Sequence, residues 1–407
     1  MYRFVKEYDK EKITEFVNKS ELVNLFQCHP WEEVKNNWKH HFTAVLNEKD
    51  EIVASALVLK RDLPLGKCLF YIPRGPILDY SNYELLDFFL DNLKDLAKEE
   101  KAIALRFDPN LCCREYKYED RENQGERKYL DLIEHLEAKK YKHGGFTTGT
   151  SDNTQPRFNG GTIVGENYIE SLNSKTMRYL RYCELCGIKI KQGSQEIHNL
   201  AQSIKYTEQR KGVALRNEEY FQHIYDTYQD NCLCITSYFN PDEQFQEIEK
   251  LIKEAETELA SDISKKRKRE LENSLTRYQK VFKDLEKAKE DYPNQEILTG
   301  GALAYFNENI MEIAYMGNNP DFLHTRSSYL LYYTCLKYCQ DHNIKRCSFG
   351  GIDGHLNDGL TMFKSAWDLI IEEYIGEFNL VLDPLMYFGL SKVHPFLLKL
   401  SAKLRKR

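Results

Sequence analysis

Apolar residues in the first 110 positions follow two different periods. Helical spacing runs over residues 12–26, and a strong amphipathic pattern covers 82–99. Alternation of apolar and polar residues over 43–46 and 52–59, with the turn residues 47–50 between them, predicts a β-hairpin. Residues 67–72 and 102–107 predict two more strands, the second stopped by Asp108-Pro109. The polar segment 114–128 is expected to be a loop.

A similar order of elements recurs in the second half of the chain. Helices are expected over 174–187, 217–229 and 329–342, and strands over 232–239, 297–306, 310–316 and 346–349. The turn residues 307–309 join the second and third of these strands. Two units of similar order suggest an internal duplication and an α/β (α+β) fold.

One segment has a different composition from the rest. Residues 242–292 contain no Gly and no Pro, and half of residues 243–290 are charged. The few apolar residues are helically spaced, and the pattern breaks near 260–262, where Ser261 or Asp262 is a suitable helix cap. We therefore expect two antiparallel helices in a coiled-coil-like hairpin, each roughly 25–35 Å long at 1.5 Å per residue.

Five consecutive cations lie near the turn of this hairpin: Lys265, Lys266, Arg267, Lys268 and Arg269. A run of charge on a helix is usually a solvated face. Here the cations gather at one end of an otherwise charge-balanced arm, which leaves phosphate binding, and tRNA binding in particular, as an equal alternative. A nuclear-localisation signal is disfavoured because the run is expected to be helical.

Composition limits the class of protein. The chain has 407 residues, 42% of them apolar and 29% charged, which is typical of a globular protein with two or three domains. The net charge of −6 excludes a globally basic nucleic-acid binder. The 11 cysteines are an odd number, and the CxxC pair Cys183 and Cys186 lacks the second well-spaced ligand pair of a zinc site, so we expect thiols and no metal.

The sequence predicts a cytoplasmic protein. Its first residues lack an apolar run of signal-peptide length, and no stretch approaches the length that spans a bilayer. The basic, amphipathic residues 397–407 suggest either a solvated last helix or weak attraction to the anionic inner face of a membrane.

Common catalytic motifs are missing. The sequence contains no GxxxxGK[ST], no GxGxxG after a strand, no HExxH and no GxSxG. The order of elements is similar to that of acyl-CoA acyltransferases, but their pyrophosphate-binding turn is not found. The densest glycine cluster, residues 349–367, follows a strand and leads into a loop that delivers Phe363 and Lys364.

Four stretches in order resemble the FemABX peptidyltransferase family, which builds the interpeptide bridge of peptidoglycan from aminoacyl-tRNA. Gly359–Trp367 is similar to its GLxxFKxxF/W pattern; the other three stretches are 31–38, 71–77 and 216–221. The resemblance covers essentially the whole chain, including the arm. Within the family it is closest to the branching enzymes that add Ala or Ser to the stem-peptide lysine of lipid II.

The resemblance implies two GNAT-like acyltransferase domains with an inserted coiled-coil arm. The expected first domain is 1–157, joined by 378–396, and the second is 158–241 with 296–377. The arm is 242–295 and the basic tail 397–407.

The resemblance also implies site residues. Lys364 is expected nearest the chemistry, with Phe363 shaping or gating the channel. Lys35 and Trp38 would hold the acceptor, Lys35 near its phosphates. Arg216 and Tyr220, one helical turn apart, would do the same from the second domain, and Tyr315 is a looser candidate.

The implied reaction is aminolysis of an ester. Ala, Ser or Gly would pass from aminoacyl-tRNA to the stem-peptide amine of lipid II or of its soluble nucleotide-linked precursor, at the inner face of the membrane. An ester is an activated donor, so no cofactor is expected, and the sequence offers no evident base apart from the acceptor or water. The alternatives are a non-catalytic tRNA-binding protein, favoured by the basic arm, and an acyl-CoA-dependent N-acyltransferase.

Overall fold

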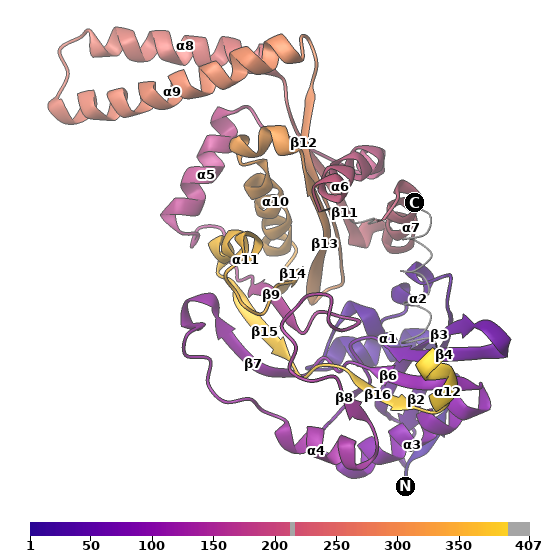
Figure 1. Ribbon diagram of the computed structural model, residues 1–407. Coiled ribbons are helices and arrows are strands. Elements are labelled where there is room, and N and C mark those ends of the chain that lie inside the picture. Colours follow the sequence, from indigo (N-terminus) through magenta and orange to yellow (C-terminus); the bar gives the residue numbers. More distant parts are fainter. Residues whose placement is uncertain (212–215, 390–407) are drawn as a thin grey trace. The chain divides into compact units, whose positions relative to one another are not determined.

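The computed structural model describes residues 1–211 and 216–389 (Figure 1), of which it gives no side-chain detail for Arg210 and Lys211. The fold is mixed α/β, as expected, and the chain divides into two compact units. Among the described residues, unit 1 comprises residues 1–162 and 348–389, and unit 2 is Ile163–Cys347. The units therefore change over after 162 and 347, where 157 and 377 were expected. The predicted basic tail 397–407 and the residues 390–396 lie outside the described residues.

Unit 1 is built on a sheet with the strand order β1-β2-β3-β4-β6-β16-β8, and β5 pairs with β3. Its strands are β1 (Arg3–Val5), β2 (Lys39–Leu46), β3 (Ile52–Leu63), β4 (Lys67–Ile72), β5 (Ile77–Leu78), β6 (Ala102–Phe107), β8 (Lys142–His143) and β16 (Phe378–Val381). The predicted hairpin is confirmed as the antiparallel pair β2–β3. The predicted strands over 67–72 and 102–107 are confirmed as β4 and β6, which run parallel.

Helix α3 (Tyr83–Glu99) covers this sheet and confirms the strongest amphipathic pattern. Its apolar residues recur every three or four positions, so they share one face and enter the core with β3, β4 and β6. Asn82 begins the helix, because its side chain accepts a hydrogen bond from the backbone N–H of Leu85.

Two sequence predictions in the first 162 residues of unit 1 are wrong. The helix expected over 12–26 is α1 (Lys10–Lys19); it ends at Ser20, and only a 3-10 turn and the short α2 (Pro30–Val34) follow. The segment expected to be a loop contains β7 (Cys112–Lys117), which pairs with β15 (Ile370–Tyr374). β15 also pairs with β9 (Phe158–Ile163). A strand whose partner lies so far along the chain leaves little local signal.

Unit 2 contains four antiparallel strands in the order β10-β11-β12-β13. They are β10 (Lys189–Gln192), β11 (Cys232–Phe239), β12 (Ile297–Phe306) and β13 (Ile310–Asn318). The helices are α5 (Ser174–Leu185), α6 (Ile197–Lys211), α7 (Glu218–Tyr228) and α10 (Ser327–Asp341). All except β10 and α6 were predicted. The chain returns to unit 1 through β14 (Arg346–Gly351).

Glycines explain how closely α6 approaches the sheet of unit 2. A Cβ at Gly317 would lie 2.2 Å from the carbonyl oxygen of Ser203 on α6. One at Gly301 would lie 3.3 Å from the Cα of Leu200. Only a residue without a side chain permits this packing at Gly317.

The charged segment forms α8 (Pro241–Leu259) and α9 (Lys265–Asp291), between the paired strands β11 and β12. Figure 1 shows them side by side, and the rings of Phe245 and Phe282 lie 4.4 Å apart. The cap of α9 is Ser264, whose side chain accepts from the backbone N–H of Arg267, rather than Ser261 or Asp262.

The remaining helices are α4 (Leu130–Ala138), α11 (Gly359–Lys364) and α12 (Pro384–Phe388). Among the helices over residues 1–211 and 216–389, none combines the length and the apolar character needed to cross a bilayer.

Candidate functional site

Lys364 is a buried lysine at the end of a short helix. It is the last residue of α11, where a loop was expected; the side chain of Asp358 begins this helix by accepting from the backbone N–H groups of Leu360 and Thr361. Lys364 is 3% exposed. Its Nζ donates to the carbonyl oxygen of Gly351 at 3.1 Å and lies 3.5 Å from that of Gly350. The carbonyl groups at the end of β14 therefore hold the amino group of Lys364 in place, and Phe363 beside it is half-buried.

A chain of contacts leads from this lysine to a buried carboxyl group within unit 1. A Cβ at Gly351 would lie 2.5 Å from Cγ of Pro156. The carbonyl of Pro156 accepts from the guanidinium of Arg74 at 2.8 Å. The backbone N–H of Arg74 donates to Asp108 at 3.0 Å. The glycine turn that holds Lys364 is thus connected to Asp108.

Asp108 is a titratable group that the sequence analysis treated only as the end of a strand. Burial raises the pKa of its carboxyl group to about 7, against the opposing effects of Arg74 and Tyr71. Its second oxygen is buried, and the Tyr71 hydroxyl lies beside the carboxyl group. The only sequence signal was an aspartate directly after a buried strand.

Lys35 and Trp38 lie on the turn that follows α2. The Lys35 Nζ lies 4.6 Å from the centre of the Trp31 ring, and the guanidinium carbon of Arg61 lies 5.8 Å from that of Trp38. Trp38 borders a cavity of about 510 Å³ together with Lys39, His40, His41, Lys60 and Glu100. The two predicted acceptor-binding residues therefore each stack with a different partner.

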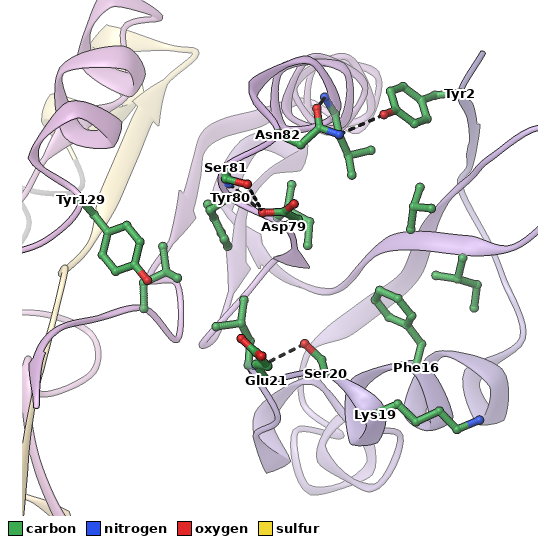
Figure 2. Close-up of a pocket in the computed structure, with 16 residues that line it drawn as sticks. Tyr2, Phe16, Lys19, Ser20, Glu21, Asp79, Tyr80, Ser81, Asn82 and Tyr129 are labelled. Carbon is green, nitrogen blue, oxygen red and sulfur yellow. Dashed lines mark hydrogen bonds between the residues drawn. The ribbon is translucent and has the colours of Figure 1, made fainter.

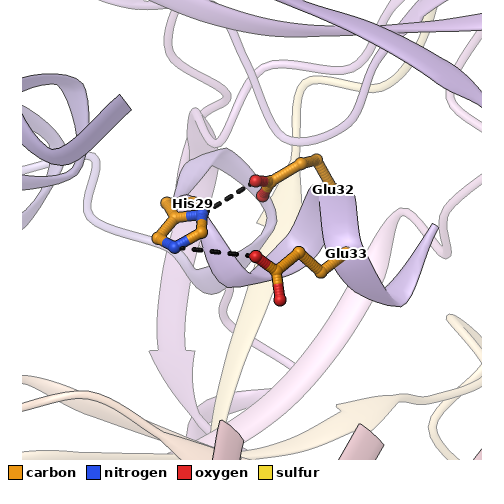
Figure 3. Close-up of side chains that lie close together, drawn as sticks. All are labelled: His29, Glu32 and Glu33. Carbon is orange, nitrogen blue, oxygen red and sulfur yellow. Dashed lines mark hydrogen bonds and ion pairs between the residues drawn. The ribbon is translucent and has the colours of Figure 1, made fainter. Parts of the chain in front are cut away.

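A cluster of potential metal ligands precedes Lys35. His29 Nδ1 lies 2.8 Å from Glu32, and its Nε2 lies 3.8 Å from Glu33 (Figure 3). Lys10 Nζ lies 3.5 and 3.7 Å from the same two carboxylates. Because Lys10 pairs with both carboxylates and His29 contacts each of them, the cluster is explained as a polar network that fixes α2.

Arg216, Tyr220 and Tyr315 come together in unit 2. The Arg216 guanidinium lies 4.7 Å from the Tyr220 ring, and the rings of Tyr220 and Tyr315 are 6.1 Å apart. Burial raises the pKa of Tyr315, and Tyr220 raises it further, whereas Arg216 lowers it. The structure thus joins Tyr315, the looser candidate, to the two predicted residues on and before α7.

The five cations at the arm tip are exposed in the first turns of α9. Arg267 already has a partner on α8, because its Nε and one terminal nitrogen donate to the two oxygens of Glu258 at 2.6 and 2.7 Å. Cations near a helix N-terminus are unfavourable with respect to the helix dipole.

A second cavity of unit 1, about 670 Å³ in volume, contains none of the predicted site residues. Figure 2 shows it between Tyr2, Phe16, Tyr80 and Tyr129, with Asp79 accepting from Ser81 at its edge. Its wall is mainly apolar and is formed by residues of α1, of β3 and of the start of α3.

The eleven cysteines are free thiols. Burial raises the pKa of Cys183 and of Cys186 to about 12, so this CxxC pair stays protonated at neutral pH.

Comparison with known proteins agrees with the resemblance found in the sequence. The lipid II:glycine glycyltransferase of Staphylococcus aureus strain MRSA252 is 28% identical over 418 residues and covers 96% of both chains. The same enzyme of strain MW2 has the same identity and coverage. The crystal structure of FemX superposes with a TM-score of 0.73 at 25% identity, over 95% of this chain and 98% of that one. The sequence model of the FemAB family matches residues 8–394. The chain therefore belongs to the FemAB family and is an enzyme of the acyltransferase type.

Proposed function

We propose that this enzyme transfers an amino acid from aminoacyl-tRNA to the stem-peptide amine of lipid II during synthesis of the peptidoglycan interpeptide bridge. The observation that carries the proposal is Lys364, a buried ammonium group held by the carbonyls of a glycine turn in a chain of the FemAB family. The name of the S. aureus relatives makes glycine the first amino acid to test, before Ala and Ser.

Ester aminolysis defines what the site must supply. The amine attacks the ester carbonyl, the carbonyl oxygen becomes an oxyanion, and the tRNA hydroxyl leaves. A preorganised cation contributes most where negative charge develops, typically ~10²–10³ in rate. Lys364 fits this role because the carbonyls of Gly350 and Gly351 fix its position before the substrates arrive. Phe363, exposed in part beside it, would shape the entry.

Substrate binding is assigned to the remaining predicted residues. Lys35 and Arg216 would contact phosphates of lipid II, and each is stacked on an aromatic ring that holds its side chain. Trp38, Tyr220 and Tyr315 would line the acceptor path. Because lipid II is membrane-bound, the enzyme would work peripherally at the inner membrane face.

The arm would bind tRNA through its tip. Lys265, Lys266, Lys268 and Arg269 are exposed cations in the first turns of α9, and the adjacent Arg267 is paired with Glu258.

Transfer of label tests the proposal. Wild-type protein is incubated with lipid II and with tRNA charged with radiolabelled Gly, Ala or Ser, and lipid-linked label is counted in a single turnover. Lys364→Met should reduce the rate at least ~10²-fold while the fold persists. The exposed Lys142 of the same unit provides the matched control, Lys142→Met, which should keep the wild-type rate. RNA binding without any labelled lipid would establish the non-catalytic alternative, and an unchanged rate in Lys364→Met would remove the role of Lys364.

A further inference from the structure

The base of the arm contains a cavity that no predicted site residue lines. Its volume is about 680 Å³, and it lies within unit 2 where α5, α9 and the turn before α10 meet. It is lined by Arg178, Tyr179, Arg181, Tyr182, Leu185, Arg277, Lys280, His324 and Arg326. Five of these nine residues are arginine or lysine, and none is acidic.

The cations of this basic pocket are not neutralised by neighbouring carboxylates. Among the described residues, none of the five has a carboxylate oxygen within 4.0 Å. Arg277 donates to Asn273 and Ser274 of its own helix. Asp284, one turn beyond Lys280, is the carboxylate whose charge acts on Tyr182. The cavity therefore keeps a large excess of positive charge, all of it on exposed side chains.

Aromatic rings form part of the wall. The guanidinium carbon of Arg326 lies 5.1 Å from the centre of the Tyr179 ring, and that of Arg178 lies 5.6 Å from it. The centres of the Tyr179 and Tyr329 rings lie 4.7 Å apart. The Tyr182 side chain is partly buried, and its hydroxyl lies beside the Cys186 thiol. Cations beside aromatic faces are what a phosphate next to a stacked base requires.

The pocket is continuous with a basic stripe on α9. At 100° per residue, Lys266, Arg269, Arg277 and Lys280 fall on one face of the helix, and all four are exposed. That face is opposite Leu271 and Leu275, which belong to the apolar seam. From Lys266 to Lys280 the stripe extends roughly 20 Å at 1.5 Å per residue. The tip predicted from sequence and the pocket thus form one track.

We propose that this basic pocket binds the phosphate backbone and one unpaired or terminal base of an RNA, and that the stripe on α9 guides the same strand. The inference rests on the proposed function, because the RNA would be the tRNA part of the aminoacyl donor. A membrane surface fits less well, because a bilayer is flat and presents no base, whereas a concave cavity of this volume with aromatic walls accommodates a nucleotide.

Binding of uncharged tRNA tests the pocket without requiring catalysis. Arg181→Glu/Lys280→Glu changes the charge by −4 at exposed positions. Lys250→Glu/Lys253→Glu makes the same change on the exposed surface of α8 and is the matched control. Fluorescence anisotropy over a range of salt should show at least ~10-fold weaker binding for the pocket variant. Its slope of log K against log salt should fall by about one to two, because each phosphate that the protein neutralises contributes ~0.7–0.9 to the slope. The control should stay within about twofold.

Three results would overturn the inference. The first is an equal loss of tRNA affinity in the pocket variant and the control variant, which would indicate general electrostatic repulsion. The second is no loss of tRNA affinity in either variant. The third is that the pocket variant loses binding to vesicles of anionic phospholipid while its tRNA affinity is unchanged. Transfer separates this inference from the proposed function. Pocket-dependent tRNA binding without transfer to lipid II would disprove the function and leave the pocket standing. Transfer that is impaired with full-length charged tRNA, and normal with an acylated trinucleotide, would support both.

Discussion

Unit 1 and the arm of unit 2 both contain many charged residues, but they place them in opposite environments. Unit 1 buries Glu373 completely, where three guanidinium groups surround it. The arm leaves its charges exposed, and even the two-point contact of Arg267 with Glu258 lies at the surface, with both side chains about half exposed.

The difference shows why the count of charges says little about their contribution. A buried charge without a partner is costly, so its partners are essential to the stability of the fold. When an exposed ion pair is broken, water replaces the lost partner, so little stability is lost. The comparison predicts large effects on stability in unit 1, and effects on binding but not on stability in the arm.

Glu373→Gln should have the largest effect on stability. Burial raises the pKa of Glu373, but hydrogen bonds from Arg127, Arg157 and Arg114 outweigh it, and the net pKa is lowered. The variant leaves Arg157, 1% exposed, without its countercharge, which should cost about 3–5 kcal/mol in urea unfolding near neutral pH.

The pH dependence of the Glu373→Gln effect provides a second test. A lowered folded-state pKa stabilises the protein above the unfolded value, and this stabilisation disappears as the pH falls through the folded value. The difference between wild type and variant should therefore shrink in acid. Glu122→Gln, which removes an exposed partner of Arg121, is the control and should leave stability unchanged. A difference that grew in acid would contradict the assignment.

Asp108→Asn should change the stability less than Glu373→Gln does, and the effect should depend on pH in the opposite direction. The folded-state pKa of Asp108 is raised to about 7, so the folded protein holds a proton that the unfolded chain releases at lower pH. Wild-type stability should consequently fall as the pH rises from about 4 to about 7, by roughly 1.4 kcal/mol per unit from this group. Asparagine accepts the same hydrogen bond from the backbone of Arg74 and does not titrate. Stability of the variant relative to wild type should increase by about 2 kcal/mol between about pH 5 and about pH 7. A constant difference would show that the carboxyl group is ionised at both pH values.

The sequence predicted elements best where a continuous apolar run or a regular apolar spacing marks the buried residues. The strands over 67–72, 102–107, 232–239 and 297–306 have the predicted bounds. The two arm helices were found from their apolar spacing within a segment free of Gly and Pro. Strand β7 was missed because its partner β15 lies some 250 positions away. Helix α6 was missed because its packing depends on a glycine of strand β13, which is far away in the sequence.

The candidate site was predictable to a different extent. Lys364 and Arg216 were named from local motifs, whose residues are adjacent in sequence. Asp108, the Glu373 cluster and the basic pocket could not be named in this way. Each is assembled from segments distant in the chain, and burial, which shifts the pKa of Asp108, is a property of the folded unit.

Neutralising the arm tip should change binding rather than stability. With Lys265, Lys266, Arg267, Lys268 and Arg269 replaced by glutamine, tRNA affinity at low salt should fall several-fold. The salt dependence should flatten as well, by ~0.7–0.9 in slope for each phosphate that the tip no longer neutralises. The midpoint of thermal unfolding should stay the same or rise slightly, because cations at the N-terminus of α9 oppose the helix dipole. Unchanged RNA affinity at low salt would show that the tip is only a solvated end.

Glu258→Gln should have the smallest effect and separates the two regions most directly. The carboxylate receives two hydrogen bonds from Arg267, and these bonds hold the pKa of Glu258 below its usual value. In unit 1, removal of a carboxylate that pairs with arginine should greatly reduce the stability. Here both groups reach water, so the unfolding midpoint should not move measurably. Because Arg267 is released from its intramolecular partner, tRNA binding should become up to about twofold tighter if the tip contacts phosphates. A marked loss of stability would mean that the contact across the turn, rather than the apolar seam, holds α8 and α9 together.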